Sequence, residues 1–493
     1  MRKINLFIGG EYRSPSTERY FQVINPATKD IVAEVAEANE QDVELAVQNA
    51  LHAFTNTEWA HDRQLRFDVL NRLSSLLRAN LDELTELESV ITGRPIREMK
   101  AQLLRLPEWY EYFASVLKTM ENSSPPFSGS YVNYTQRLPL GVVGLITPWN
   151  HPLLILTKKL APALAGGNAV VIKPSENAPV TPSILGDLAK QAGVPNGILN
   201  IVQGFGTVAG KALSTHPALE KIDVTGGTET GRHIASAAGF NLAKVAAELG
   251  GKASVLILPD ANMEEAVNGS AFAAFIATGQ TCVQGSRIFV HESQYEVFVE
   301  KLVEKTKSLT IGDPSSLETD IGPVISERQY RRILDYIQIG IEEGATVACG
   351  GEPFEGNGFF IQPTIFTNVR NDMRVAQEEI FGPVTCIIKY TSIEELVKQA
   401  NGTDMGLAMS VWSNNIRLAH QVVNQLEAGI VWINDHHRID PSSPWGGFKS
   451  SGIGLENSIQ CFNDYTKLRN VIVNISTEPF DWFDGSQQVK RYS

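Results

Sequence analysis

Short apolar runs alternate with helical patterns along residues 141–204 of this chain. The runs GVVGLI (141–146), AVVIK (169–173) and ILNIVQG (198–204) are separated by LLILTKKLAPALAGG and TPSILGDLAKQAG. Apolar segments of this length, joined by helices, are typical of parallel βαβ units. The alternation therefore predicts an α/β fold with a doubly wound sheet.

The flanking sequence continues the pattern in both directions. Residues 40–121 carry long amphipathic helical patterns, one of which covers 64–93 and stops at a glycine. A second strand and helix alternation begins with ASVLIL (253–258) and includes ATVACGG and PVTCIIKY. Because single cores stop growing at roughly 250 to 300 residues, we expect at least two domains.

Two segments read as β-structure outside these alternations. Residues 125–141 are rich in Tyr, Val and Thr between turn residues, and DYTKLRNVIVNIS (464–476) is strand-like. The second segment is expected to pair with the first or with another subunit through exposed edges. Residues 477–493 show no clear periodicity.

Charge and cysteine usage narrow the class of protein. The net charge of -13 argues against nucleic-acid and anionic-membrane partners. No run approaches the ~18 apolar residues of a membrane span, and the first residues do not resemble a secretory signal. The cysteines are widely separated and form no C-x-x-C pair, which favours reduced thiols over disulfides or a metal site. We therefore expect a cytoplasmic protein.

Cys282 is the most unusual of the cysteines, because it lies between two glycines in GQTCVQGSR. With disulfide and metal roles disfavoured, it is either a small buried hydrophobic residue or a nucleophile. Gly279 and Gly285 are expected to let the backbone approach a substrate closely.

Two motifs favour a dinucleotide. Gly206 and Gly210, in GFGTVAG, lie between a predicted strand and a predicted helix, where free N–H groups can hold a pyrophosphate. A simple tight turn is the alternative reading. Lys173 and Glu176 follow the strand AVVIK, and a carboxylate there can accept the hydroxyls of a ribose. The alternative is a solvated Lys and Glu in a loop.

Two further polar residues are candidates for catalysis. Glu248 follows small apolar residues in AAELGGK, and burial would raise its pKa and make it a better base near neutral pH. Asn150, in TPWNHP, can offer an amide donor to a developing oxyanion. The alternatives are that Glu248 is simply exposed to solvent and that Asn150 only shapes a turn.

Taken in order, the motifs TPWNHP, KPSE, GFGTVAG, VTGGTETG, ELGGK, GQTC, EEIFGP and PWGGFKSSGIG resemble those of the aldehyde dehydrogenase superfamily. The resemblance covers nearly the whole chain. It implies that Cys282 is the nucleophile, Glu248 the general base and Asn150 the oxyanion donor. It also implies NAD as cofactor, with NADP less favoured, an aldehyde as substrate, and a homodimer or homotetramer.

The resemblance further implies three parts in the subunit. They are a Rossmann-like cofactor domain (1–121 and 142–251), an α/β catalytic domain (252–450), and a small β oligomerisation element with a C-terminal tail (122–141 and 465–493). The implied cofactor-binding residues are Ile146, Thr147, Pro148, Trp149, Lys173, Ser175, Glu176, Gly206, Gly210, Gly227, Thr230, Leu249, Glu379 and Phe381.

The positions that correspond to the aldehyde tunnel are His151, Ile155, Lys158, Thr281, Val283, His437, Arg438, Ile439 and Trp445. Lys158 and Arg438 would give the tunnel positive character and favour a carboxylated or polar aromatic aldehyde. The alternative is that both turn outward into surface or intersubunit salt bridges.

Three positions depart from the common family pattern: Gly227 replaces Ser, Val224 replaces Phe and Leu455 replaces Arg. None is a nucleophile, base or oxyanion position. Two other functions stay possible: a CoA-acylating aldehyde dehydrogenase, which generally lacks a base at the position of Glu248, and a catalytically inactive, crystallin-like structural relative.

Overall fold

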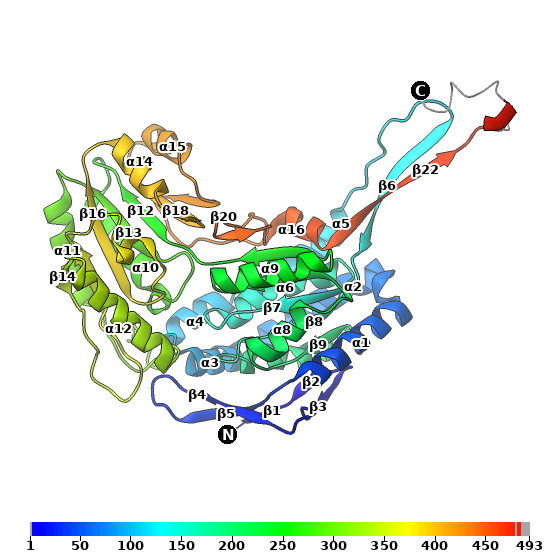
Figure 1. The fold of residues 1–493 in the computed structure, drawn as a ribbon, viewed down its shortest axis with the longest axis horizontal. Coiled ribbons are helices and arrows are strands. Elements are labelled where there is room, and N and C mark those ends of the chain that lie inside the picture. The colour runs from blue at the N-terminus through cyan, green and yellow to red at the C-terminus, as the bar shows by residue number, and fades with distance from the viewer. Residues whose placement is uncertain (1, 479–480, 485–493) are drawn as a thin grey trace.

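The structure is a computed structural model that describes residues 2–478 and 481–484, and an eight-stranded sheet forms its centre (Figure 1). Five neighbouring strands are parallel. They are β7 (Val142–Ile146), β8 (Ala169–Lys173), β9 (Leu199–Ile201), β10 (Leu219–Thr225) and β11 (Lys244–Glu248). The α/β fold predicted from the alternation is confirmed.

Shorter strands complete this sheet at both edges. β2 (Leu6–Ile8) pairs antiparallel with β9 and is followed outward by β3 (Glu11–Arg13). At the other edge, β21 (Gly452–Ile453) pairs antiparallel with β11. The C-terminal motif around residue 452 is thereby held against the strand that ends in Glu248.

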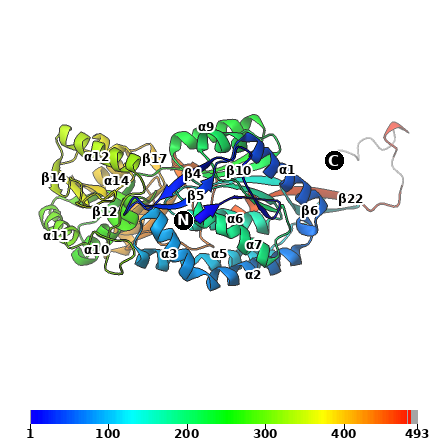
Figure 2. The same cartoon turned by 90° about the horizontal axis from the view of Figure 1, so that it is seen from below.

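Helices cover both faces of the sheet (Figure 2). They are α1 (Glu40–Asn56), α2 (Arg63–Ala79), α3 (Leu81–Thr92), α4 (Ile96–Leu103), α5 (Leu106–Thr119), α6 (Pro152–Ala165), α7 (Val180–Ala192), α8 (Lys211–Ser214) and α9 (Thr228–Phe240). Every residue of α6 is buried, which explains why its sequence is apolar nearly all round.

The helical pattern at 64–93 is two helices rather than one. α2 ends at Asn80, whose N–H donates to the carbonyls of Leu76 and Leu77, and α3 begins at the next residue. Gly93 ends α3 in the left-handed conformation at φ 76°, as a glycine after a helix commonly does. The sequence thus predicted where the pattern stops and missed the break inside it.

A seven-stranded sheet lies beside the first one along the length of the molecule (Figures 1 and 2). Its strands are β12 (Ala253–Ile257), β13 (Gly285–His291), β14 (Thr346–Cys349), β15 (Thr364–Thr367), β16 (Val384–Tyr390), β18 (Ala408–Trp412) and β19 (Ile430–Ile433). Its helices include α10 (Met263–Phe275), α11 (Tyr295–Lys307), α12 (Glu327–Glu342), α14 (Ile393–Asn401) and α15 (Ile416–Val423).

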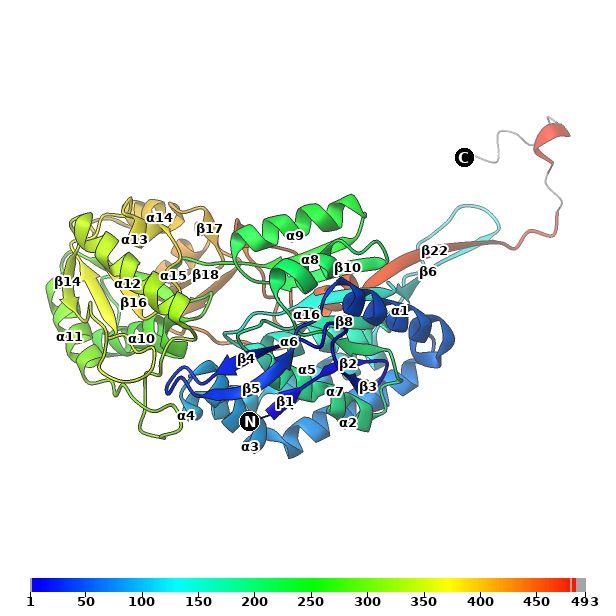
Figure 3. The same cartoon turned by 60° about the horizontal axis from the view of Figure 1, so that its bottom comes forward.

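A two-stranded ribbon projects from the body (Figure 3). β6 (Tyr131–Pro139) pairs antiparallel with β22 (Thr466–Asn474), so the two β segments found in the sequence do pair with each other. A short helix, α16 (Ser458–Asp464), leads into β22. Residues 479–480 and 485–493 of the expected C-terminal tail lie outside the described residues.

The N-terminal segment adds a three-stranded sheet, in which β5 (Ile31–Ala36) lies between β1 (Arg2–Ile4) and β4 (Tyr20–Ile24). No described helix is long and apolar enough to cross a membrane.

Candidate active site

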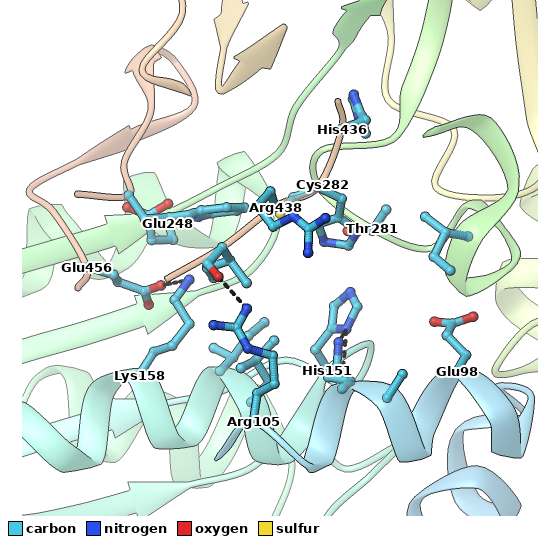
Figure 4. Close-up of a pocket in the computed structure, with 18 of the residues that line it drawn as sticks. Glu98, Arg105, His151, Lys158, Glu248, Thr281, Cys282, His436, Arg438 and Glu456 are labelled. Carbon is cyan, nitrogen blue, oxygen red and sulfur yellow. Dashed lines mark hydrogen bonds and ion pairs between the residues drawn. The ribbon is translucent and has the colours of Figure 1, made fainter. Parts of the chain in front are cut away.

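A cavity of about 320 Å³ contains Cys282 in its wall (Figure 4). The residues around it come from α4, α5, α6 and α10 and the turns beside these helices, from the ends of β10 and β11, and from the segments before β13 and after β19. They are Arg94, Glu98, Ala101, Gln102, Arg105, Trp109, His151, Leu154, Ile155, Lys158, Thr225, Glu248, Phe272, Ile276, Thr281, Cys282, Asp435, His436, His437, Arg438, Ile439, Trp445 and Glu456.

The segment that carries Cys282 follows α10 through a tight, left-handed turn. Ala277 and Thr278 both have φ of 55°, an unusual conformation for residues with a β-carbon. Glu98 holds this turn from α4, because its carboxylate accepts from the N–H of Ala277 at 3.0 Å. A β-carbon on Gly279 would lie 2.1 Å from the carbonyl oxygen of Gly382.

This packing corrects the expectation for the two glycines. Gly279 is needed where two backbone segments meet, and a β-carbon on Gly285 would lie 2.7 Å from Val255. Both glycines therefore allow close packing inside the protein, and neither is shaped by the approach of a substrate.

The thiol of Cys282 is neutral at pH 7 in this state. Burial raises its pKa to about 12, and the carboxyl groups of Glu248, Glu379 and Glu456 act in the same direction. Lys158 opposes them, since its positive charge favours the thiolate.

Glu248 is the last residue of β11 and is buried in the wall of the same cavity. Neither of its carboxyl oxygens has a hydrogen-bond partner within the described chain. Burial raises its pKa well above the usual value, and the nearby Glu456 adds to this, whereas Lys158 and Lys159 oppose it. An unpaired carboxyl group with a raised pKa, beside a cysteine, can exchange protons with a water or a thiol that enters the cavity.

Asn150 is buried next to the cysteine segment, and its side-chain amide donates to the carbonyl oxygen of Gln280 at 2.9 Å. The backbone carbonyl oxygen of Asn150 accepts from Nη1 of Arg94 at 3.2 Å. The side-chain amide is therefore held against Gln280, which lies two positions before Cys282 in the chain. Asn150 itself is not among the residues that line the cavity.

A buried ionic network lies behind Glu248 (Figure 4). Glu456 pairs with both Lys158 and Lys159, with its Oε1 2.6 Å from Nζ of Lys159, and Lys159 also pairs with Asp223. Burial alone would raise the pKa of Glu456, but the two lysines lower it to about 2. The network ties α6 to the strand β10 and to the C-terminal motif.

The position of Lys158 therefore matches neither interpretation of the sequence, the cationic tunnel or the surface salt bridge. Its side chain is buried, pairs with Glu456 and lies 4.4 Å above the ring of Trp445, so it neither reaches the surface nor offers an unpaired charge. Arg438 does turn outward: its side chain is 75% exposed and pairs with Asp435 at 3.2 Å.

Eight of the nine predicted tunnel residues line the cavity, and Val283 is the exception. Val283 is fully buried in a small apolar cluster with Trp445 and Leu407. Its carbonyl oxygen accepts from His436 Nε2 at 2.7 Å. Val283 is thus part of the support behind the cysteine, because its side chain points into protein.

Sequence reasoning missed the lining residues of α4 and α5 and also Glu456. Arg94, Gln102 and Arg105 lie in a helical region that shows only an amphipathic pattern, and nothing in that pattern distinguishes a buried arginine from a surface one. The lone Pro95 after Gly93 was the only local signal of a change in direction.

The predicted cofactor residues gather at the carboxyl ends of the parallel strands. Ile146, Thr147, Pro148 and Trp149 follow β7, Lys173, Ser175 and Glu176 follow β8, Gly206 and Gly210 follow β9, Gly227 and Thr230 follow β10, and Leu249 follows β11. Open α/β sheets bind ligands at this edge.

Details of this edge leave room for a ligand. A β-carbon on Gly206 or Gly227 would meet no atom within 4 Å. Lys173 Nζ lies 3.3 Å from the carboxylate of Glu176, and the hydroxyl of Thr147 is buried without a partner in the described chain. Gly206–Gly210 forms a π-helical turn between β9 and the short helix α8.

Two predicted cofactor residues approach from the other sheet. The ring of Phe381 meets that of Trp149 edge to face, with centroids 5.2 Å apart. Glu379 accepts from the N–H of Gly251 at 2.9 Å, and burial raises the pKa of its carboxyl group. These two contacts join the segment before β16 to the carboxyl ends of the parallel strands in the eight-stranded sheet.

The three departures from the family pattern have different surroundings. Gly227 is the N-cap of α9 with open space at its α-carbon, Val224 is fully buried in the core, and Leu455 packs against Gly446. None of the three contacts Cys282 or Asn150 in a hydrogen bond.

Comparison with known proteins agrees with this geometry. The family model described as "Aldehyde dehydrogenase family" matches residues 12–471. "Aldehyde dehydrogenase 1" of Tanacetum cinerariifolium is 40% identical, over 96% of each chain. "Retinal dehydrogenase 2" of Homo sapiens is 41% identical, over 95% of this chain and 92% of the relative.

Solved structures agree as well. An aldehyde dehydrogenase from Bacillus cereus, solved as an NAD+ complex, has a TM-score of 0.95 and 40% identity, over 96% of this chain and 97% of that chain. A betaine aldehyde dehydrogenase from Staphylococcus aureus, in complex with NAD+, has the same TM-score and 33% identity, over 97% and 96% of the two chains. The chain therefore belongs to the aldehyde dehydrogenase family.

Proposed function

We propose that this enzyme oxidises an aldehyde to the carboxylic acid with NAD. The observation that carries the proposal is that the thiol of Cys282 and the unpaired carboxyl group of Glu248 face one cavity. A nucleophile and a proton acceptor in one enclosed site can form a thioester and then hydrolyse it.

In the proposed reaction, the thiol of Cys282 gives up its proton to water in the cavity and its sulfur adds to the aldehyde carbon. The resulting oxyanion is held by the side-chain amide of Asn150 and by the N–H of Cys282. NAD, when bound, accepts the hydride that the thiohemiacetal loses, which leaves a thioester on Cys282. Glu248 then takes a proton from water, the water oxygen adds to the thioester carbon, and the acid leaves as the thiol re-forms.

The edge of the eight-stranded sheet fits NAD. Gly206 and Gly227 leave open space for a close approach of phosphate to the backbone, and Thr147 offers a buried hydroxyl without a partner in the described chain. We propose that Lys173 and Glu176 bind the adenosine ribose and that Glu379 and Phe381 contact the nicotinamide side. The remaining predicted residues of this edge complete the proposed site.

We expect preference for NAD over NADP by about tenfold or more in kcat/KM, because the carboxylate of Glu176 accepts ribose hydroxyls and repels a 2′-phosphate. Glu176→Gln keeps the size of the side chain and removes the charge. It should therefore lower the ratio of kcat/KM for NAD to kcat/KM for NADP. Steady-state rates with both cofactors measure this ratio in the two proteins. Equal kcat/KM for NAD and NADP in the wild type would contradict the assignment.

For the substrate, we propose a polar or aromatic aldehyde. Trp445, Trp109 and Phe272 supply flat apolar walls, and Gln102, His151 and His437 supply polar ones. A carboxylated aldehyde has less support from the structure than from the sequence, because Lys158 and Arg438 are each already paired with a carboxylate.

The chief alternative is a CoA-acylating dehydrogenase, in which the thioester passes to CoA. The unpaired carboxyl group of Glu248 beside Cys282 supports hydrolysis instead. We expect NADH formation without CoA, free acid as the product, and no more than about a twofold change in rate when CoA is added. Formation of an acyl-CoA at the rate of NADH formation would contradict hydrolysis.

The same assay tests the crystallin-like alternative, since a structural relative would form no NADH. We also propose a cytoplasmic location, a homodimer or homotetramer, and the three-part division of the subunit at 1–121 with 142–251, 252–450, and 122–141 with 465–493.

A further inference from the structure

One wall of the cavity is unusually polar. Gln102 lies on α4, Arg94 lies just before that helix, and His151 is the N-cap residue of α6. Arg94 is 2% exposed and His151 is 4% exposed. Buried polar groups are nearly always hydrogen-bonded, so any atom of this wall without a partner points to a missing one.

The hydrogen bonds of Arg94 determine which nitrogen of His151 carries the hydrogen. Nη1 of Arg94 lies 2.6 Å from Nδ1 of His151, and a guanidinium group has only donors. Gln102 acts in the same way: its Oε1 accepts from Arg94 at 3.0 Å, which directs its amide nitrogen toward the same Nδ1 at 2.9 Å. Oε1 of Gln102 also lies 3.3 Å from Nδ1, but the two shorter contacts both come from donors, so Nδ1 accepts.

The ring of His151 is neutral. Burial lowers its pKa well below the usual value, and the charges of Arg94, His437 and Lys158 lower it further. A neutral imidazole whose Nδ1 accepts must carry its hydrogen on Nε2. Nε2 is buried, and it has no hydrogen-bond partner within residues 2–478 and 481–484. The side chain rises from the start of α6 toward the Cys282 segment (Figure 4).

The cations around the cavity are already neutralised by carboxylates. The pairs are Arg94 with Glu98, Arg105 with Glu108, Lys158 with Glu456, and Arg438 with Asp435. A carboxylate on the substrate would therefore have to compete with a carboxylate of the protein. A neutral acceptor oxygen needs only a donor, and His151 has one.

We infer that the Nε2–H of His151 donates a hydrogen bond to a neutral ether, hydroxyl or carbonyl oxygen of the aldehyde substrate, and so selects oxygenated aldehydes over hydrocarbon ones. The inference rests on the proposed aldehyde oxidation and narrows its substrate class. His151 acts as a specificity residue, and Arg94 and Gln102 are positioning residues that fix its tautomer.

The test compares methoxybenzaldehydes with ethylbenzaldehydes, substituted at position 3 or 4. The two groups are similar in size, but only the methoxy oxygen accepts a hydrogen bond. We measure kcat/KM in the wild type, in His151→Phe and in His420→Phe, the same substitution at a histidine on α15 that does not line the cavity. Dividing the methoxy-to-ethyl ratio of the wild type by that of a variant cancels the intrinsic reactivity of each aldehyde.

For at least one ring position, the wild-type ratio should exceed that of His151→Phe about tenfold, which is the loss expected when one hydrogen bond is removed. His420→Phe, whose side chain is exposed and outside the cavity, should keep the wild-type ratio. Equal ratios in wild type and His151→Phe would overturn the inference, while oxidation of both aldehydes would leave the proposed function intact. Absence of NADH formation with every aldehyde would instead overturn the proposed function.

A measurement on the wild type alone covers the case in which His151→Phe does not fold. Anisole and ethylbenzene differ in the same single oxygen and cannot react. An apolar cavity would favour ethylbenzene, so a lower inhibition constant for anisole supports the donor. Equal or weaker inhibition by anisole would overturn it.

Discussion

Cys282→Ala should abolish NADH formation, with a loss in kcat on the order of 10⁴-fold or more, because no other group can form the thioester. The substitution removes one sulfur atom from a packed segment and leaves the left-handed turn at Ala277 and Thr278 in place. Initial rates at saturating aldehyde and NAD measure the loss.

Cys349→Ala is the matched control for this experiment. Cys349 is a free thiol as well, but it is buried on β14 and lies outside the cavity. The control should keep its activity, and thermal unfolding should show that both variants fold. Appreciable steady-state turnover by Cys282→Ala would refute the assignment of the nucleophile.

Glu248→Gln should separate the two halves of the reaction. Acylation does not need the base, so the variant should release close to one NADH per active subunit in a burst. Steady-state turnover should then fall by roughly 10²- to 10⁴-fold, the usual contribution of general base catalysis. Stopped-flow absorbance resolves the burst from the steady state, and loss of the burst would show that Glu248 acts earlier than proposed.

The surroundings of Glu248 also fix the direction of a pH effect. Burial and Glu456 raise its pKa, and Lys158 and Lys159 only partly offset them; Asp223 adds to the increase. The carboxyl group therefore becomes a base at a higher pH than an exposed glutamate does. Wild-type deacylation should speed up as the pH rises through the raised pKa of Glu248, and the slow turnover of Glu248→Gln should lack this dependence.

The fold could be predicted because its signal is local. Strands such as AVVIK and helices such as α6 are buried on all sides, so their sequences are continuous apolar runs that alternate at βαβ spacing. The break between the helices at Asn80 was not predicted, because α2 and α3 each bury an apolar stripe and the two stripes follow one another without an interruption in the sequence.

The candidate site was predictable only where a motif marked it. Cys282, Glu248 and Asn150 lie in short motifs, and the structure brings all three to one region. The partner of Lys158 is Glu456, nearly 300 positions away, and no local pattern connects them. A lysine at that position therefore looks like an unpaired charge in the sequence, although in the fold it is neutralised and packed against Trp445.

The same limit applied to His151. Its place in the tunnel followed from a motif, but the nitrogen that carries its hydrogen depends on Arg94 and Gln102, which come from a different helical region. Tautomers are set by three-dimensional contacts, so sequence reasoning could name the residue and not its role.

If the protein forms the proposed homo-oligomer, the ribbon of β6 and β22 would make the stability of each subunit depend on the protein concentration. Two strands without a covering layer are marginally stable in water, and Leu468, Ile472 and Val473 of this ribbon are exposed. In the homo-oligomer that we propose, a partner that covers these side chains binds only the ordered ribbon. By mass action, association then stabilises it in proportion to the logarithm of protein concentration. Dilution should therefore loosen the ribbon before either large sheet loses its order.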